Sequence, residues 1–292
     1  VVTLPVNRQD IEFYVVDLPG VKPLLGLKDC LRLDLIALSA EVFEVRNAAS
    51  EVDAFTEFSV LFDSDVGELP VTYRMTLDKS VFPVVRPARR VPAAMQDKVQ
   101  QELNRMVQIG VITPCTEPTD WVSAMVAQHK KGTDEIRVCI DPRDLNKALK
   151  RPHHPTKTVE EVAAKMDGAT IFSVLDAKSS FWQVPLDHQS SMLTCFSTPY
   201  GRYRFLRMPY GLCASSDVFQ HAMETLFEGL PCSIIVDDIL VGGKDQQEHD
   251  KNLRQVLNRA KEVNLKLNPS KCKFGVSNVS YVGHLFTSDG LK

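Results

Sequence analysis

The sequence predicts an α+β fold in which strands and helices do not alternate regularly. Two apolar, strand-like runs each end in carboxylates, the first at Asp176 and the second at Asp237 and Asp238. Amphipathic helical patterns lie between and after them, so the order is strand, helix, hairpin, helix rather than the repeated βαβ of a doubly wound sheet. With 292 residues and 44% hydrophobic content, the chain can form one large domain or two small ones.

The N-terminal part of the chain is predicted to hold a small β-rich piece followed by a linker. Residues 11–17 alternate like a strand, Pro19 and Gly20 favour a turn, and residues 24–31 have the pattern of a short helix. Residues 41–70 are acidic and show little periodicity, which is typical of a loosely held connection. We therefore expect a domain boundary near residue 75.

The next segment predicts a helix and a β-hairpin. Four apolar residues at spacings of four, four and three form one helical face: Met95, Val99, Leu103 and Met106. Gly110 would close this helix. Residues 121–126 and 136–140 are strand-like, and the polar residues 128–135 between them predict a hairpin.

The C-terminal half predicts two helices on either side of a second hairpin. The first helix is expected to bury Val218, Phe219, Ala222, Met223 and Leu226. The hairpin follows over residues 234–241. The second helix would begin at Asp245 with Glu248 three residues later, as in a capping box, and would bury Leu253, Val256, Leu257 and Ala260. Short strands are expected over 271–274 and 281–286.

Charge is distributed unevenly along the chain. The net charge is −3, but residues 81–160 carry 13 Lys and Arg against 9 Asp and Glu, whereas residues 1–80 carry 7 against 14. A basic segment of this size is a modest footprint for a polyanionic partner such as nucleic acid. A solvated charged surface would give the same pattern, and charge alone does not separate the two.

The cysteine pattern and the hydropathy favour an intracellular protein. The seven cysteines include no Cys-x-x-Cys pair, so neither a zinc ribbon nor a disulfide framework is indicated. No apolar stretch reaches the roughly 20 residues that a membrane span needs. The N-terminus lacks the charged and then apolar layout of a signal peptide. We expect a protein that is not secreted and has no membrane partner.

Three carboxylates are expected to meet at one end of a sheet, because Asp176 ends one strand and Asp237 and Asp238 lie in a tight turn. Such carboxylates repel one another unless a cation neutralises them, and their hard oxygens suit Mg²⁺ or Mn²⁺. Two ions about 3.5–4 Å apart would favour phosphoryl or nucleotidyl transfer. The competing interpretation is structural, because Asp also favours turns for its own hydrogen bonding.

Other candidate site residues lie elsewhere in the pattern. Lys130 in the first hairpin and Arg137 on its second strand could hold a triphosphate, although exposed lysines often only aid solubility. Phe181 could form a pocket wall against a sugar 2′-hydroxyl, although a Phe beside Trp182 is also typical of a core. Gly211 would let the backbone approach a nucleotide or template, or serve only as a turn.

Taken together, these motifs resemble the reverse transcriptases of LTR retrotransposons, particularly the gypsy type, and more distantly those of retroviruses. The resemblance covers residues 78–292. Its motifs lie at 109–112, 137–146, 172–176, 208–212, 218–220, 236–238 and 265–272. Each motif is weak alone, and the combination is highly specific.

The resemblance implies the right-hand fold of a polymerase with fingers over about 95–155, a palm over about 156–263 and the start of a thumb over 264–292. Residues 281–286 resemble the primer-grip hairpin. The implied activity is that of an RNA-directed DNA polymerase, which adds deoxynucleotides to a primer 3′-end. Its implied partners are an RNA or DNA template with primer and deoxynucleoside triphosphates, in a cytoplasmic particle or the nucleus.

The resemblance also implies roles for the site residues. Asp176 and Asp237 match the ligands of both Mg²⁺ (or Mn²⁺) ions, Asp238 matches a supporting carboxylate, and the carbonyl of Ala177 matches an added ligand.

Substrate contacts carry over in the same way. Lys130 and Arg137 match the triphosphate contacts. Phe181 matches the gate that favours deoxynucleotides, and Tyr210 and Gly211 match the nucleotide and template contact.

Residues 1–45 resemble the C-terminal end of a retropepsin-like aspartic protease. Residues 46–77 would then form the acidic linker to the reverse transcriptase domain of residues 78–292. Neither Asp-Thr-Gly nor Asp-Ser-Gly occurs in the sequence, so we expect a remnant without protease activity.

Two other functions stay open. An inactive or host-retained fragment that binds nucleic acid without turnover would be consistent with Ile235, which stands where the family usually has an aromatic residue. A different metal-dependent palm enzyme, such as a nucleotide cyclase, would leave the motif around Arg137 unexplained. The sequence does not determine the template, the primer or the oligomeric state.

Overall fold

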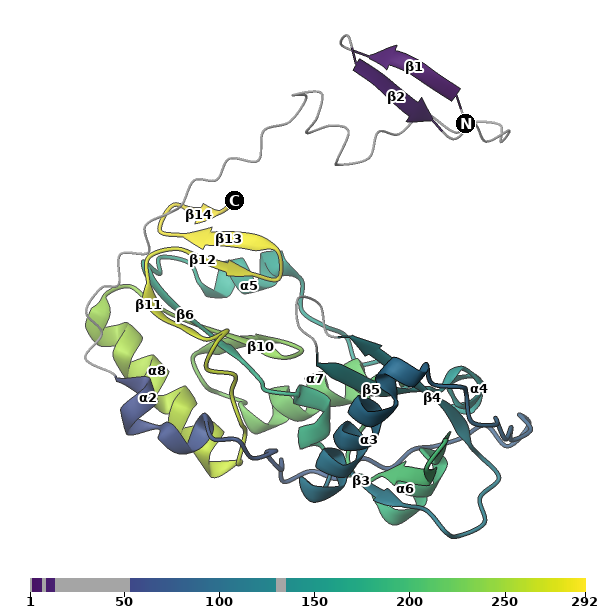
Figure 1. Ribbon diagram of the computed structural model, residues 1–292. Coiled ribbons are helices and arrows are strands. Elements are labelled where there is room, and N and C mark those ends of the chain that lie inside the picture. The colour runs from purple at the N-terminus through teal and green to yellow at the C-terminus, as the bar shows by residue number, and fades with distance from the viewer. Residues whose placement is uncertain (1, 7–8, 14–52, 130–134) are drawn as a thin grey trace. The chain divides into compact units, whose positions relative to one another are not determined.

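The computed structural model (Figure 1) describes residues 2–6, 9–13, 53–129 and 135–292. The chain forms two compact units, residues 1–44 and 45–292. In the first unit, β1 (Val2–Val6) pairs antiparallel with β2 (Gln9–Phe13). The strand expected over 11–17 thus begins two residues earlier, and its partner β1 was not predicted. The helix expected over 24–31 lies outside the described residues.

The second unit contains a four-stranded antiparallel sheet in the order β11–β6–β10–β9. Its strands are β6 (Ile171–Asp176), β9 (Cys232–Ile235), β10 (Asp238–Gly243) and β11 (Lys273–Val276). In Figure 1, the helices α7 (Ser215–Leu226) and α8 (Gln246–Glu262) lie below this sheet. The helix α5 (Val159–Lys165) and the hairpin of β12 (Val279–Tyr281) and β13 (His284–Thr287) lie above it.

Side chains of β6 and β10 alternate between two hydrophobic cores, because successive residues of a strand point to opposite faces of the sheet. Leu175 and Ile239 pack in the core that includes α8. Phe172, Val174 and Leu240 pack in the core that includes α5 and the β12–β13 hairpin. A one-residue slip would exchange the two sets, so the strand ends that carry the carboxylates are held in register.

The two predicted helices of the C-terminal half are present. Asp245 caps α8 by accepting a hydrogen bond from the Glu248 amide at 2.8 Å. The four residues expected inside this helix are fully buried: Leu253, Val256, Leu257 and Ala260. In α7 the expected residues Phe219, Ala222 and Met223 are buried, whereas Val218 and Leu226 are only partly so, because they flank the buried stripe.

A five-stranded sheet in the order β3–β8–β7–β4–β5 forms the other half of this unit. Its strands are β3 (Ile112–Pro114), β4 (Ser123–His129), β5 (Ile136–Asp141), β7 (Phe196–Thr198) and β8 (Gly201–Phe205). Strands β4 and β7 pair in parallel and the other neighbours are antiparallel. The predicted helix is α3 (Ala93–Gln108), and it packs on this sheet through Val99, Leu103 and Met106.

The acidic linker expected over 46–77 is wrong for residues 53–77. These residues form α2 (Ala54–Glu57) and the 3₁₀ helix η1 (Ser59–Leu61), and belong to the second unit. The core that contains α8 also includes five of their side chains: Ala54, Phe58, Leu61, Leu69 and Met75. The acidic side chains of this segment are exposed or only partly buried, whereas its buried apolar side chains anchor it to the core.

The remaining described elements are short: α4 (Arg143–Ala148), η2 (Ser180–Gln183), α6 (His188–Leu193) and β14 (Gly290–Leu291). Strand β14 continues the β12–β13 hairpin as a third strand. Across residues 53–129 and 135–292, no helix has the length and apolar character to cross a membrane.

A buried polar network ties α8 to the four-stranded sheet. The Nε2 atom of His249 lies 2.8 Å from Ser173 Oγ, and its Nδ1 atom lies 2.9 Å from Asp250 Oδ1. Since a carboxylate only accepts, Nδ1 carries a proton, and because burial favours the uncharged ring, Nε2 has none and accepts from the Ser173 hydroxyl. Ser173 Oγ in turn accepts from the Gly275 amide at 3.0 Å. The imidazole is therefore neutral and fully hydrogen-bonded.

We expect the free energy of unfolding to decrease as the pH is lowered, because of His249. Burial lowers the pKa of this imidazole, and the Asp250 carboxylate only partly opposes the effect. The unfolded chain therefore takes up a proton below about pH 6.5 while the folded chain does not, so the contribution of His249 is present above that pH and is lost below it. In urea unfolding, the difference in unfolding free energy between the parent and His249→Ala should become smaller as the pH is lowered from 7.5 to 5. The exposed His188→Ala control should show a constant difference, and the same constancy for His249→Ala would contradict the assignment.

Candidate active site

Three carboxylates meet where β6 ends and the β9–β10 hairpin turns. Asp176, the last residue of β6, lies directly opposite Asp238, the first residue of β10. Asp237 precedes Asp238 in the turn, and its carbonyl oxygen accepts a hydrogen bond from the Ala177 amide at 2.8 Å. The register of two strands thus brings together residues that are 61 positions apart in the sequence.

The turn is held in a strained backbone conformation. Val236 has φ = 53°, in the left-handed region that a β-branched residue rarely adopts. Gln220 of α7 holds this turn from one side: its Oε1 accepts from the Val236 amide at 2.6 Å and its Nε2 donates to the Ile234 carbonyl at 2.9 Å. Strain of this kind persists only where surrounding contacts fix it, and it is concentrated at functional sites.

A lysine that the sequence did not single out lies at the carboxylates. Lys271 Nζ is 2.9 Å from Asp176 Oδ2. The loop that carries Lys271 is anchored to the same residue, because the Asn268 amide donates to the Asp176 carbonyl at 2.8 Å. Lys271 belongs to the motif at 265–272. A lysine in one of the motifs that define a site rich in carboxylates was the signal that could have identified it from the sequence.

The site has an excess of negative charge. The pKa of Asp238 is raised to about 6, first by burial and then by the neighbouring Asp237 and Asp176 carboxylates, with Lys271 opposing the shift. One ammonium group therefore does not compensate three carboxylates. A cation bound at this site would remove the repulsion.

We expect Asp238→Asn to stabilise the protein in the absence of divalent metal. Because the folded pKa of about 6 lies above the ordinary aspartate value of 3.8, the parent loses stability as pH rises through this range. The substitution removes that loss, by about 1 kcal/mol after allowing for the partial exposure of the group. The difference in unfolding free energy should be small at pH 4 and complete at pH 7. The exposed Asp97→Asn control should show no such pH dependence, and an Asp238→Asn gain independent of pH would rule out relief of repulsion.

The donor atoms suit Mg²⁺ or Mn²⁺. Asp176 and Asp237 offer hard carboxylate oxygens beside the backbone of Ala177, the type of ligand that these ions prefer. No three His, Cys, Asp or Glu side chains of the described residues are arranged to hold a metal ion together. Mg²⁺ usually binds through one or two carboxylates, with water or substrate phosphates as the other ligands, and Asp176 and Asp237 could serve as those two. A metal ion on Asp176 would have to compete with Lys271.

An aromatic wall stands beside the carboxylates. The Phe181 ring in η2 lies 5.0 Å from the Tyr210 ring and 6.0 Å from the Phe219 ring, measured between centroids. Burial raises the pKa of Tyr210, and the charges of Asp237 and Arg137 act on it with opposite signs. The charges of both Asp237 and Arg137 therefore act on Tyr210.

The other predicted residues are placed as follows. Arg137 is exposed on β5, opposite Gln128 of β4. Lys130 lies outside the described residues. Gly211 has φ = +99°, a backbone conformation that favours glycine, whereas a Cβ there would make an ordinary contact with Pro142 at 3.4 Å. Of the predicted residues, the structure thus brings the three carboxylates together and Phe181 next to Tyr210, and it does not describe Lys130.

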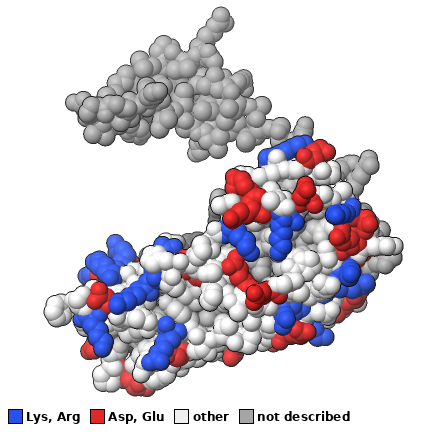
Figure 2. Space-filling model, turned by 180° about the vertical axis from the view of Figure 1, so that it is seen from behind, with Lys and Arg blue, Asp and Glu red and all other residues white. Residues whose placement is uncertain are grey.

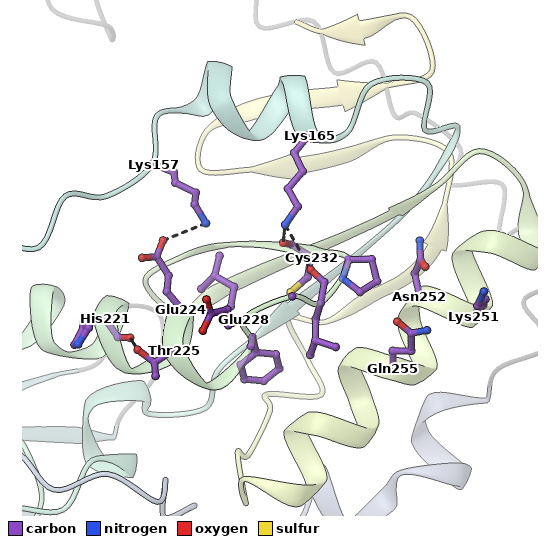
Figure 3. Close-up of a pocket in the computed structure, with 15 residues that line it drawn as sticks. Lys157, Lys165, His221, Glu224, Thr225, Glu228, Cys232, Lys251, Asn252 and Gln255 are labelled. Carbon is purple, nitrogen blue, oxygen red and sulfur yellow. Dashed lines mark hydrogen bonds and ion pairs between the residues drawn. The ribbon is translucent and has the colours of Figure 1, made fainter.

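Two cavities lie away from the carboxylates. One of about 880 Å³ follows the outer edge of β9 (Figure 3). Two of its lysines have partners within it: Lys157 Nζ is 3.2 Å from Glu224 Oε1, and Lys165 Nζ is 2.5 Å from the Cys232 carbonyl oxygen. Lys165 therefore covers a sheet edge that would otherwise be open to pairing with another chain.

The second cavity, of about 450 Å³, is lined by four cations of the basic segment: Arg86, Arg89, Arg143 and Lys147. Asp141 and Asp144 pair with them, and the Arg143 and Arg89 guanidinium groups hold the pKa of Asp141 at about 2 although burial opposes this. The space-filling view from behind likewise shows Lys and Arg interspersed with Asp and Glu (Figure 2).

Comparison with known proteins gives a consistent match. Residues 128–286 match the family model described as reverse transcriptase (RNA-dependent DNA polymerase). The chain is 35% identical over 209 residues to an uncharacterized protein of Caenorhabditis elegans, covering 70% of this chain and 16% of that protein. It is 31% identical over 217 residues to the retrovirus-related Pol polyprotein from transposon 412 of Drosophila melanogaster, covering 72% of this chain and 17% of the polyprotein. The chain therefore spans about one sixth of the length of these relatives.

Solved structures support the fold class. The foamy viral protease-reverse transcriptase in complex with an RNA/DNA hybrid matches with a TM-score of 0.72 at 19% identity, over 81% of this chain and 32% of that chain. The same protein in complex with double-stranded DNA matches with a TM-score of 0.73 at 19% identity, over 84% of this chain and 53% of that chain. The predicted α+β fold of a right-hand polymerase is thus confirmed.

Proposed function

The chain belongs to the reverse transcriptase (RNA-dependent DNA polymerase) family, and we propose that it is an RNA-directed DNA polymerase that adds deoxynucleotides to a primer 3′-end. The observation that carries this proposal is the register of β6 and β10, which sets Asp176 opposite Asp238 with Asp237 in the adjoining turn. Three carboxylates with too little positive charge around them suit a reaction that uses divalent metal.

In this proposal, Asp176 and Asp237 hold Mg²⁺ or Mn²⁺, with the Ala177 carbonyl as a further ligand and Asp238 as a supporting carboxylate. The bound metal would supply stabilisation of the attacking 3′-hydroxyl and of the departing pyrophosphate oxygen. The protein's own contribution is alignment: β6 and the β9–β10 turn fix the carboxylates, and the Ala177 amide fixes the backbone of Asp237. Lys271 neutralises Asp176 at 2.9 Å, and a bound metal ion would take over that role.

The deoxynucleotide would bind between the carboxylates and β5. Arg137 and Lys130 are the proposed triphosphate contacts, with Arg suited to bidentate binding. Phe181 is the proposed gate against the 2′-hydroxyl, and Tyr210 and Gly211 the proposed contacts to nucleotide and template. The charges of Asp237 and Arg137 both act on Tyr210, which supports this arrangement.

The proposed partners are an RNA or DNA template with its primer and deoxynucleoside triphosphates, without a membrane partner. The matched foamy viral structures are complexes with an RNA/DNA hybrid and with double-stranded DNA, which supports a nucleic-acid partner here. An intracellular location, in a cytoplasmic particle or the nucleus, follows from the same proposal.

We further propose a gypsy-type retrotransposon origin, because relatives at 30–31% identity are polyproteins of transposons. Residues 1–45 would be the C-terminal remnant of a retropepsin-like domain. Fingers over about 95–155, a palm over about 156–263 and the start of a thumb over 264–292 are the proposed divisions of the reverse transcriptase domain. Three strands of the four-stranded sheet, β6, β9 and β10, lie within the palm range, and β11 comes from the range after it.

The test is Mg²⁺-dependent extension of an oligo(dT) primer on poly(rA) by the purified chain, beside a filter-binding assay with the same duplex. Extension that requires Mg²⁺ would support the polymerase. Binding without extension, under conditions where the duplex is saturated, would favour the alternative of an inactive fragment that binds nucleic acid. Ile235, half-buried beside the turn, would then be the first residue to change to an aromatic one.

A further inference from the structure

A tyrosine of the next hairpin reaches the backbone of the carboxylate turn. Tyr281, at the end of β12, is only 1% exposed, and its ring packs edge-on against Phe286 at 5.8 Å between centroids. Its hydroxyl lies 3.1 Å from the Asp238 carbonyl oxygen and 3.3 Å from the Ser233 carbonyl oxygen. A buried phenol needs a hydrogen-bond partner, and here both partners belong to the β9–β10 hairpin.

The two acceptors lie on different strands of that hairpin. Ser233 is in β9 and Asp238 is in β10, so they flank the turn residues Val236 and Asp237. One hydroxyl shared between them links the strands just below the turn. The Asp238 carbonyl belongs to the same stretch of backbone that carries the Asp237 and Asp238 side chains. A shift of this backbone would therefore move both carboxylates.

The turn requires such support because its conformation is not intrinsically favoured. Val236 has φ = 53°, a region in which a β-branched side chain is strained. Gln220 of α7 holds the Val236 amide, and Tyr281 of β12 holds the carbonyl two residues later. The turn is thus held by side chains from two elements that are remote from it in sequence.

We propose that Tyr281 is a positioning residue whose hydroxyl holds the Asp237–Asp238 turn in register with Asp176 and so couples the β12–β13 hairpin to the carboxylates. The effect on metal binding rests on the proposed function, whereas the effect on the turn does not. The phenyl ring alone fills the core, so Tyr281→Phe separates the hydroxyl from the packing.

The experiment compares Tyr281→Phe with Tyr200→Phe in the full chain. Tyr200, which lies between β7 and β8, is the matched control. Its hydroxyl also donates to a backbone carbonyl, that of Gln96 in α3, at 2.9 Å. Amide hydrogen exchange by mass spectrometry should show about fivefold faster exchange in peptides covering 235–239 for Tyr281→Phe only, the size expected for one net hydrogen bond. Exchange there equal to the parent, or faster to the same degree in both variants, would overturn the proposal.

A second measurement gives the consequence for the site. The Mg²⁺ concentration at half-maximal primer extension should rise about fivefold in Tyr281→Phe, while the rate at saturating Mg²⁺ stays near that of the parent. A purely structural loss would instead lower the saturated rate with an unchanged Mg²⁺ midpoint, and would overturn the positioning role. If the parent itself does not extend a primer, the proposed function fails, and the exchange measurement alone decides the role of Tyr281.

Discussion

Replacing Asp237 with Asn is expected to lower the rate of Mg²⁺-dependent primer extension by about 1,000-fold or more, as is Asp176→Asn. Under the proposed function, each substitution removes a charged oxygen that would hold the metal ion, an effect of several kcal/mol, and each 1.36 kcal/mol corresponds to tenfold in rate. The amide keeps the shape of the side chain, so the β6–β10 register should be preserved. Single-turnover extension on a primed template would measure the loss directly.

The control for this experiment is Asp97→Asn on the exposed side of α3, which should extend primers at the parental rate. Circular dichroism and unfolding curves should show the two site variants folded. An extension rate in Asp237→Asn within about tenfold of the parent would contradict the metal-ligand role. A tenfold loss corresponds to an increase of only about 1.4 kcal/mol in activation free energy, which is too small for a lost metal contact. A binding assay should separate this result from loss of duplex affinity.

The carboxylates of this site were predictable from the sequence because a charge inside an apolar run is costly without a partner. The alternation of apolar side chains between two cores, together with the tight turn, then fixes the register that sets Asp176 opposite Asp238. The supporting contacts were not predictable in the same way. Lys271 lies 95 residues from Asp176, and Tyr281 lies 43 residues from Asp238, so only the folded chain shows that they meet. Periodicity describes a residue's own element and carries no signal for such contacts.

The fold shows the same division between strong and weak local signals. Helix α8 was predicted closely, because its cap and its apolar stripe agree with each other. Helix α2 and η1 were missed, because they are too short to show a periodic pattern and are stabilised by packing of Phe58 and Leu61. Strand β1 contains Pro5, a residue that argues against a strand except at an edge, and an edge is where β1 lies.

Phe181→Val is expected to let the protein incorporate ribonucleotides. The Phe181 ring is half-buried beside Tyr210 and Phe219, in the short helix that follows Asp176, so it can contact the sugar of a nucleotide held at the carboxylates. Val is smaller by most of the ring and would leave room for a 2′-hydroxyl. Steric discrimination of this kind is worth roughly 1–3 kcal/mol, so the preference for deoxynucleotides should fall about 10- to 100-fold.

The measurement is the ratio of kcat/KM for a deoxynucleotide and the matching ribonucleotide, taken for the parent and the variant. Phe62→Val is the matched control, because Phe62 is also a half-buried ring, packed 4.9 Å from Phe55 in a separate aromatic cluster. Both variants lose similar packing, so a general loosening of the fold would change their sugar selectivity equally. A change confined to Phe181→Val would support the gate, because only that ring stands beside the carboxylates. Unchanged selectivity in Phe181→Val would reject the gate and assign the ring to the core alone.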